Sequence, residues 1–157
     1  ERLLQFRSFH DSLTGLYNRT YFEEEMRRLD MRRNGSVTVF VVDVDGLKLI
    51  NDTLGHDRGD LLLAKVAQLL QSCFRESDIG SRIGGYEFAA LIAEAGEPEA
   101  KLIYSRIYQE IERWNNAKDQ EILSLSVGFS SSAHPETKMR ELFKRADDNM
   151  CREKLHR

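Results

Sequence analysis

The sequence predicts an α/β protein of the α+β kind, with a ferredoxin-like βαββαβ core around a central, mostly antiparallel sheet and additional helices. Three observations lead to this prediction. The length of 157 residues suits one domain. Apolar, β-branched runs typical of strands are separated by segments with helical spacing. A Gly-Gly pair between two short apolar runs indicates a hairpin, and therefore antiparallel pairing.

A helix is expected before the core, and a central strand follows it. Asn18 is suited to cap this helix. Its apolar residues then recur at helical spacing, at Phe22, Met26 and Leu29. Asn34-Gly35 ends the pattern, and the β-branched, mostly apolar residues 37–44 predict a central strand.

The middle of the chain predicts a turn, a helix and a hairpin. Residues 55–60 indicate a polar turn, and a wide apolar face predicts a helix over 61–74. A short strand over 79–83 pairs with a second over 88–92, and the tip of their hairpin is Gly84-Gly85-Tyr86.

Two helices and one strand complete the pattern. Pro98 stands where the first of these helices begins, and apolar side chains line one face of it. Apolar residues alternate over 122–130, as in a strand. The final amphipathic helix carries Met139, Leu142, Phe143, Ala146 and Met150. From residue 37 onward the order is therefore βαββαβ, followed by one more helix.

The composition excludes several classes of protein. Acidic residues exceed basic residues by 26 − 23 = 3, without the basic excess typical of nucleic-acid binders. The apolar fraction of 41% argues against disorder, and no apolar run approaches the ~20 residues of a membrane span. No signal segment opens the chain. Cys73 and Cys151 fall in apolar helical patterns, so we expect buried, reduced thiols and a cytoplasmic location.

Asp43 and Asp45 stand at the end of the predicted central strand. Alternation points both side chains to the same face. Such a pair suits Mg²⁺, which takes one or two carboxylates plus the phosphates of a substrate. A solvated strand end would contain the same residues.

A second polar segment, residues 49–60, contains Asn, His and Asp side chains able to hydrogen-bond a base edge. Backbone N–H groups near Gly46 and Leu47 could receive phosphates, with Lys48 as a charge partner. Turn formation, with Asp60 capping the next helix, explains the same residues.

The paired glycines Gly84 and Gly85 form the third cluster. They permit positive φ and a close approach of the backbone to a ligand. A simple hairpin would use the same pair.

Taken in order, five motifs resemble the GGDEF family of diguanylate cyclases. They are 11–19 (DSLTGLYNR), 43–52 (DVDGLKLIND), 55–60 (GHDRGD), 82–88 (RIGGYEF) and 126–129 (SVGF). The resemblance implies a nucleotidyl-cyclase-like GGDEF domain over 11–157. Residues 1–10, with Leu3, Leu4, Phe6 and Phe9 on an otherwise polar helix, are expected to be the end of a linker helix from a longer protein. Members of the family join two GTP molecules into cyclic di-GMP, and each domain of an antiparallel pair holds one GTP.

The resemblance also implies roles for individual residues. Asp43 would ligate Mg²⁺ or Mn²⁺ with help from the Val44 carbonyl, and Lys48 would neutralise charge on the triphosphate. Asn51 and Asp60 would bind the guanine edge. The full set assigned to the nucleotide is Asn51, His56, Asp60, Gly84, Gly85 and Lys154.

The chain departs from the family at the third signature residue, where Tyr86 replaces an Asp or Glu. That acid is a metal ligand and a candidate base for the attacking 3′-hydroxyl. A phenol, with a reference pKa of ~10, is neutral at pH 7 and binds Mg²⁺ poorly. Glu87 remains as a metal ligand, although successive side chains of a hairpin face opposite ways. We therefore expect a weakened metal site and doubt efficient catalysis.

Arg75 and Asp78 lie where the family has an R-x-x-D product-inhibition site. An arginine can bond guanine O6 and N7, and an aspartate can accept hydrogen bonds from the opposite edge. A surface ion pair at a helix end would show the same two residues.

The sequence thus predicts a degenerate GGDEF domain that binds GTP, cyclic di-GMP or both, with weak or no cyclase activity. It would act as a homodimer under an upstream sensor or regulatory domain of the same chain, which could be membrane-anchored. No nucleic-acid partner and no membrane contact of this segment are expected. Two alternatives stay open: an active diguanylate cyclase, and a dimerisation module that binds no nucleotide.

Overall fold

Four strands form one sheet in the order β2-β3-β1-β4, and every pair of neighbours is antiparallel. The computed structural model describes residues 8–33, 35–117 and 121–155. The strands are β1 (Val37–Val44), β2 (Ile79–Arg82), β3 (Glu87–Ala93) and β4 (Leu125–Ser132). This sheet, with its helical crossovers, confirms the predicted ferredoxin-like core.

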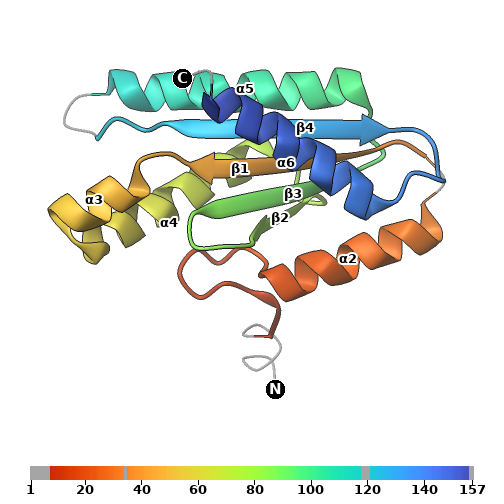
Figure 1. Cartoon of the computed structure of the whole chain (residues 1–157), viewed down its shortest axis with the longest axis horizontal. Coiled ribbons are helices and arrows are strands. Elements are labelled where there is room, and N and C mark those ends of the chain that lie inside the picture. The colour runs from red at the N-terminus through yellow and green to blue at the C-terminus, as the bar shows by residue number, and fades with distance from the viewer. Residues whose placement is uncertain (1–7, 34, 118–120, 156–157) are drawn as a thin grey trace.

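Helices cover both faces of the sheet (Figure 1). They are α2 (Arg19–Arg32), α3 (Leu47–Leu54), α4 (His56–Cys73), α5 (Glu97–Asn116) and α6 (Met139–Leu155). Helices α4 and α5 pack on one face, while α2 and α6 pack on the other. The protein therefore has two apolar layers separated by the sheet.

Strand β1 explains how the site comes to lie on one face. All eight of its residues are buried, because both faces of this central strand are covered. Phe40 and Val42 pack toward α4 and α5, whereas Val39 and Val41 pack toward α2 and α6. Alternation then places the next odd-numbered residue, Asp43, on the α2–α6 face.

Two element boundaries differ from the prediction. Residues 55–60 are not a polar turn, because only Gly55, at φ 94°, separates α3 from α4. Asp60 consequently lies inside α4 and caps nothing. The last strand begins at Leu125 rather than at residue 122, because the Asn115 amide bonds both the N–H and the carbonyl of Leu123 in place of a strand partner.

The two cysteines also differ from each other. Cys73 is buried, as predicted, whereas Cys151 is exposed. The prediction for Cys151 was wrong because it follows Met150, which faces the core, and one residue turns a helix by about 100°.

Among the described glycines, positive φ occurs at Gly15, Gly46 and Gly55, so Gly84 and Gly85 do not use the positive φ that glycine permits. Of the expected linker helix, residues 1–7 lie outside the described residues. Among the described helices, none combines the length and the apolar character that crossing a membrane requires.

Candidate functional site

Asp43 is the most buried acid at the hairpin end of the sheet, with 6% of its surface exposed. It lies opposite Glu87 in the β1–β3 register, so both carboxylates share the α6 face. Glu87 is therefore not turned away from Asp43, contrary to the sequence argument. Asp43 Oδ2 accepts a hydrogen bond from Lys154 Nζ at 3.2 Å, but its buried Oδ1 has no hydrogen-bond partner among the described residues.

Lys154, on the last turn of α6, joins the groups of this site. Its Nζ lies 3.9 Å from Asp45 Oδ1 and 6.0 Å from the centre of the Tyr86 ring. Asp45 itself accepts hydrogen bonds from the hydroxyls of Ser124 and Ser126. The Lys154 ammonium group thus lies close to the carboxylates of Asp43 and Asp45 and to the ring of Tyr86.

A fourth acid, Asp147 on α6, lies in the site and was not predicted from the sequence. Burial raises the pKa of Glu87, and the charges of Asp43 and Asp147 raise it further. Burial and Asp43 likewise raise the pKa of Asp147. The signal was available, because residues 147 and 154 are seven apart and lie on the same face of a helix.

Burial also raises the pKa of Asp43, although the hydrogen bond and the charge of Lys154 oppose it. For Lys154, burial disfavours the charged form, but the carboxylates of Asp43 and Asp45 outweigh that effect and raise its pKa. Lys154, and Arg19 at Glu87, therefore offset only part of the effect of burial and of the neighbouring acids, because the pKa values of Asp43 and Glu87 remain raised.

These residues fit a divalent cation only in part. The unpartnered Asp43 Oδ1 and the neighbouring Glu87 are oxygen donors of the kind that Mg²⁺ prefers. Within residues 8–33, 35–117 and 121–155, however, no three His, Cys, Asp or Glu side chains are arranged to hold a metal. At the position where the family has a further acid, Tyr86 is 47% exposed.

The hairpin tip is fixed by backbone and arginine contacts. The Val44 N–H donates to the Tyr86 carbonyl at 3.0 Å, which joins the tip to the end of β1. Arg82 Nη2 donates to the Gly85 carbonyl at 2.7 Å, and its Nη1 reaches Asp11 at 3.2 Å. A Cβ at Gly85 would meet nothing within 4 Å, whereas one at Gly84 would contact Glu87.

Arg82 and Asp11 therefore shape the site although neither was predicted to. Both lie within the motifs that carry the family resemblance, and that position was the only signal for them.

The residues predicted to bind guanine lie on α3 and α4. Asn51 packs against α4 so closely that a Cβ at Gly59 would lie 1.8 Å from Asn51 Oδ1. That Oδ1 is buried, and no group in the described part of the chain forms a hydrogen bond with it. His56 and Asp60 are exposed on α4, the same helix.

Lys48 is exposed on α3, and no ion pair joins it to Asp43 within the described residues. It shares the β1 end of the molecule with the acids, because α3 begins three residues after β1 ends.

Arg75 and Asp78 lie at the other end of α4. The 17 steps from His56 to Cys73 span about 26 Å at 1.5 Å per residue. Asp78 Oδ2 accepts from the Arg75 N–H at 2.7 Å, and its Oδ1 accepts from Arg75 Nη2 at 3.3 Å. The Asp78 side chain is 1% exposed and the Arg75 side chain 58% exposed, so the guanidinium faces solvent.

Comparison with known proteins places this geometry in context. Residues 8–157 match the family described as "Diguanylate cyclase, GGDEF domain". The chain is 33% identical over 151 residues to the probable diguanylate cyclase DgcC of Escherichia coli K12, covering 94% of this chain and 41% of DgcC. It is 35% identical over 148 residues to the cyclic di-GMP phosphodiesterase PdeB of Shewanella oneidensis, covering 92% of this chain and 17% of PdeB.

A solved structure is also similar. A microbial GGDEF domain, described in a novel interaction mode with cyclic di-GMP, is 31% identical, with a TM-score of 0.80 and coverage of 98% of this chain and 94% of that one. The chain spans less than half the length of the curated relatives described here.

Proposed function

Because the chain belongs to the GGDEF family of diguanylate cyclase domains, we propose that it serves cyclic di-GMP signalling by binding GTP, cyclic di-GMP or both, with weak or no cyclase activity. This proposal rests mainly on one observation, that residue 86 is a tyrosine. A neutral phenol stands where an acid of the family would ligate metal, and its ring lies near the only lysine that contacts Asp43 within the described residues.

Lys154 is the residue that balances charge in this site. Its ammonium group already neutralises one oxygen of Asp43, and it is 46% exposed and able to reach a phosphate. Holding a triphosphate by charge and position is most of what phosphoryl transfer requires of a protein. When bound, a divalent cation would neutralise the phosphates, and Asp43, the Val44 carbonyl and Glu87 are the groups that would hold it.

Losing one acid removes both a ligand and a base. With tyrosine at residue 86, the 3′-hydroxyl lacks the carboxylate of the third signature position as an acceptor for its proton. Removing one preorganised charged group typically slows an enzyme by about 10²–10³-fold. Binding of the nucleotide depends less on this group than turnover does.

Recognition of guanine is assigned to the α3–α4 pair. An unpaired buried amide oxygen, as at Asn51, costs about 1–3 kcal/mol and is uncommon unless a site needs it. Asp60 and His56 are exposed within the same pair of helices and supply acceptor and donor groups. A module that only dimerised would have no need for this arrangement, which argues against the third alternative.

An active cyclase is the second candidate. The unpartnered Asp43 Oδ1 and the adjacent Glu87 favour it, because together they could hold one cation. The relatives' names support both candidates, since DgcC is named a cyclase and PdeB a phosphodiesterase. The active form would require a homodimer, and we assign control of it to a regulatory domain elsewhere in the full-length protein.

The proposal is tested by separating binding from turnover. Calorimetric titration of the protein with a non-hydrolysable GTP analogue and Mg²⁺ should show saturable binding that Asn51→Ala abolishes. The neighbouring exposed residue supplies a matched control, so Asp52→Ala should bind as the wild type does. Rapid conversion of GTP to cyclic di-GMP by the wild-type chain would contradict the proposal, and so would an absence of binding to both GTP and cyclic di-GMP.

A further inference from the structure

Lys154 lies in the last turn of α6, next to the final residue of the helix, Leu155. The last turn of a helix frays readily, because its carbonyl groups lack partners within the helix. The contacts of the Lys154 ammonium with Asp43 and Asp45 hold only the tip of a long side chain that is 46% exposed. The backbone of this turn is fixed from a different side.

Glu153, the residue before Lys154, joins this turn to two other elements. Its Oε1 accepts a hydrogen bond from the backbone N–H of Val127, in the edge strand β4, at 3.1 Å. Its Oε2 accepts one from the hydroxyl of Tyr104, on α5, at 2.5 Å. Helices α5 and α6 pack on opposite faces of the sheet, so this contact passes around the edge of β4, where Figure 1 shows the end of α6 close to α5.

The Tyr104 side chain is itself held in place by neighbouring rings. Its ring centre lies 4.9 Å from that of Tyr108 on the next turn of α5 and 5.6 Å from that of Phe129 in β4. Aromatic contacts of this kind restrict a ring and leave the polar tip of a tyrosine free to bond. The hydroxyl that reaches Glu153 is therefore presented from a fixed position.

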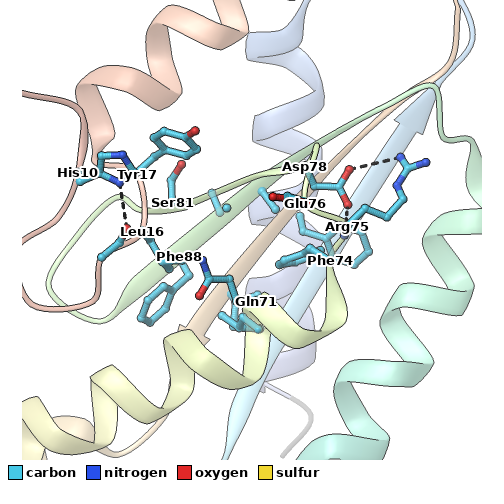
Figure 2. A pocket seen from close by; sticks show the side chains of 17 residues that line it. His10, Leu16, Tyr17, Gln71, Phe74, Arg75, Glu76, Asp78, Ser81 and Phe88 are labelled. Carbon is cyan, nitrogen blue, oxygen red and sulfur yellow. Dashed lines mark hydrogen bonds and ion pairs between the residues drawn. The ribbon is translucent and has the colours of Figure 1, made fainter. Parts of the chain in front are cut away.

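Asp78 shows the same pattern of bonding in a smaller setting (Figure 2). One of its oxygens accepts the backbone N–H of Arg75, and the other accepts a side-chain donor of the same residue. Those bonds join residues three apart, whereas the bonds of Glu153 join residues 26 and 49 positions apart. The Asp78 carboxylate thus holds a local turn, and the Glu153 carboxylate holds α6 against β4 and α5.

The contacts of Glu153 also determine which way Lys154 points. Consecutive residues of an α-helix are rotated by about 100° around its axis. With Glu153 turned to the edge of β4, Lys154 is turned to Asp43 on the α6 face of the sheet. A rotation that separated Glu153 from Val127 would therefore also move the ammonium away from Asp43.

Strand β4 receives both neighbouring residues of α6. The N–H of Val127 bonds Glu153, while the hydroxyl of Ser126 donates to Asp45 Oδ1 at 2.9 Å. Lys154 Nζ lies 3.9 Å from that same Asp45 oxygen. The position of the last turn of α6 on β4 therefore sets the distance between the ammonium and the acids.

We propose that Glu153 is a positioning residue, which together with Tyr104 fixes the last turn of α6 so that Lys154 is presented to the phosphates of a bound nucleotide. This inference rests on the proposed function, because it concerns how Lys154 meets that nucleotide. Glu153 acts through the position of Lys154 and not through its own charge.

Calorimetric titration with a non-hydrolysable GTP analogue and Mg²⁺ tests this role. Glu153→Ala should bind the analogue about fivefold more weakly than the wild type, the effect of losing one hydrogen bond of typical strength. Glu153→Gln keeps an acceptor for the Val127 N–H and an amide for the Tyr104 hydroxyl, so it should bind as the wild type does. Guanosine, which has no phosphate, should bind all three proteins equally.

Matched variants separate positioning from a general effect on α6. Glu141→Ala removes another carboxylate of this helix and should change neither affinity. Tyr104→Phe should weaken binding of the analogue by about twofold, whereas Tyr108→Phe, whose hydroxyl bonds a β4 carbonyl and not α6, should not. Combined with Lys154→Met, Glu153→Ala should cause no further loss, because the two residues act as one unit.

A measurement without nucleotide distinguishes a failure of this inference from a failure of the proposed function. Acylation with acetic anhydride, followed by mass spectrometry, compares Lys154 with Lys144, an exposed lysine of the same helix. Glu153→Ala should raise the ratio of Lys154 to Lys144 labelling by about twofold or more, because the released turn moves the ammonium off Asp43. If the wild type binds neither the GTP analogue nor cyclic di-GMP, the proposed function fails, and this ratio still tests the positioning.

Four results would overturn the proposal. Two of them concern Glu153→Ala alone: an affinity for the analogue equal to that of a wild type that binds it, or an unchanged labelling ratio in the folded variant. A third is an equal loss in Glu153→Gln, which would assign the effect to charge. The fourth is a matching loss of guanosine affinity, which would indicate a general loosening of the domain.

Discussion

Asp43 and Asp78 are both buried carboxylates next to a cation, yet the protein satisfies them differently. Both oxygens of Asp78 accept hydrogen bonds from Arg75, one from its backbone and one from its side chain. Asp43 has one oxygen on Lys154 and the other unpartnered. A carboxylate whose two oxygens both accept hydrogen bonds stabilises the turn that contains it. A carboxylate with one oxygen unbonded can still accept a hydrogen bond from a ligand or bind a cation.

The surroundings of the two acids reinforce this contrast. Asp43 lies among further acids, and burial together with mutual repulsion raises the pKa of its neighbours Glu87 and Asp147. Asp78 sits in a single turn with one arginine whose head is exposed. The proposed ligand site therefore lies at Asp43, whereas Asp78 holds a turn from which the Arg75 side chain is exposed.

The largest expected effect on the free energy of unfolding comes from a substitution that forces α6 away from the sheet. A Cβ at Gly128 would lie 2.2 Å from the Ala146 carbonyl oxygen and 2.3 Å from the Met150 nitrogen. Gly128→Val should therefore reduce the free energy of unfolding by about 3 kcal/mol or more, as measured by urea denaturation. Gly85→Ala, where the added Cβ meets open space, should cost much less. Equal losses would mean that α6 does not depend on this close contact.

The two acids themselves provide the next test. Asp78→Ala should cost about 2 kcal/mol, because it leaves the partly buried Arg75 N–H without its acceptor. Asp43→Asn should cost less and could stabilise the fold, since it removes a buried charge that is only half compensated. Urea denaturation of both variants measures the difference. A larger loss at Asp43 would reverse the comparison.

Removing the Lys154 side chain should reduce the free energy of unfolding by less than Asp78→Ala does. Lys154→Met deprives Asp43 of its hydrogen bond, but the lysine is 46% exposed, so about 1 kcal/mol is expected. The same variant should weaken binding of a GTP analogue strongly. Lys144→Met, an exposed lysine on the same helix, is the control and should change neither quantity. Unchanged nucleotide affinity in Lys154→Met would remove Lys154 from the site.

The smallest effect is a dependence of stability on pH. The pKa values of Asp43, Glu87 and Asp147 are raised in the folded protein, so the folded state binds protons more readily than the unfolded chain. Their contribution to stability should therefore improve as pH falls from neutral through the raised values toward the ordinary ones of 3.8 and 4.5. Asp147→Asn should flatten this slope below neutral pH, while Glu112→Gln, on the exposed side of α5, should not. A slope unaffected by Asp147→Asn would place that acid outside the cluster.

Much of the fold followed from the sequence, because periodicity reports burial. The mostly apolar, β-branched residues of β1 predicted the central strand, and the Gly-Gly hairpin predicted the antiparallel pairing. The start of α4 was not predicted from the sequence, because the first turn of this helix carries polar residues that are also typical of a loop. The start of β4 failed because the side chain of Asn115 takes the hydrogen bonds that a strand partner would have taken.

The site was predicted less completely, because it depends on contacts between distant segments. The sequence identified Asp43, Glu87 and Lys154 but argued that the hairpin would turn Glu87 away. The strand register shows the reverse, since residue 87 lies directly across from residue 43. The Arg82–Asp11 ion pair escaped notice because tertiary packing, and not local spacing, brings it to the site. For Asp147 the helical spacing to Lys154 was a usable signal, but its approach to Asp43 and Glu87 depends on how α6 packs on the sheet.

The central claim is that Tyr86 limits the chemistry while the rest of the site remains intact. The most direct test measures cyclic di-GMP produced from GTP and Mg²⁺ by the wild type, Tyr86→Asp and Tyr86→Phe under identical conditions. The account predicts little product from the wild type and from Tyr86→Phe, and a rise of about 10²-fold or more in Tyr86→Asp, because the carboxylate restores a metal ligand and a base. Efficient turnover by the wild type, or no gain in a folded Tyr86→Asp protein, would contradict it.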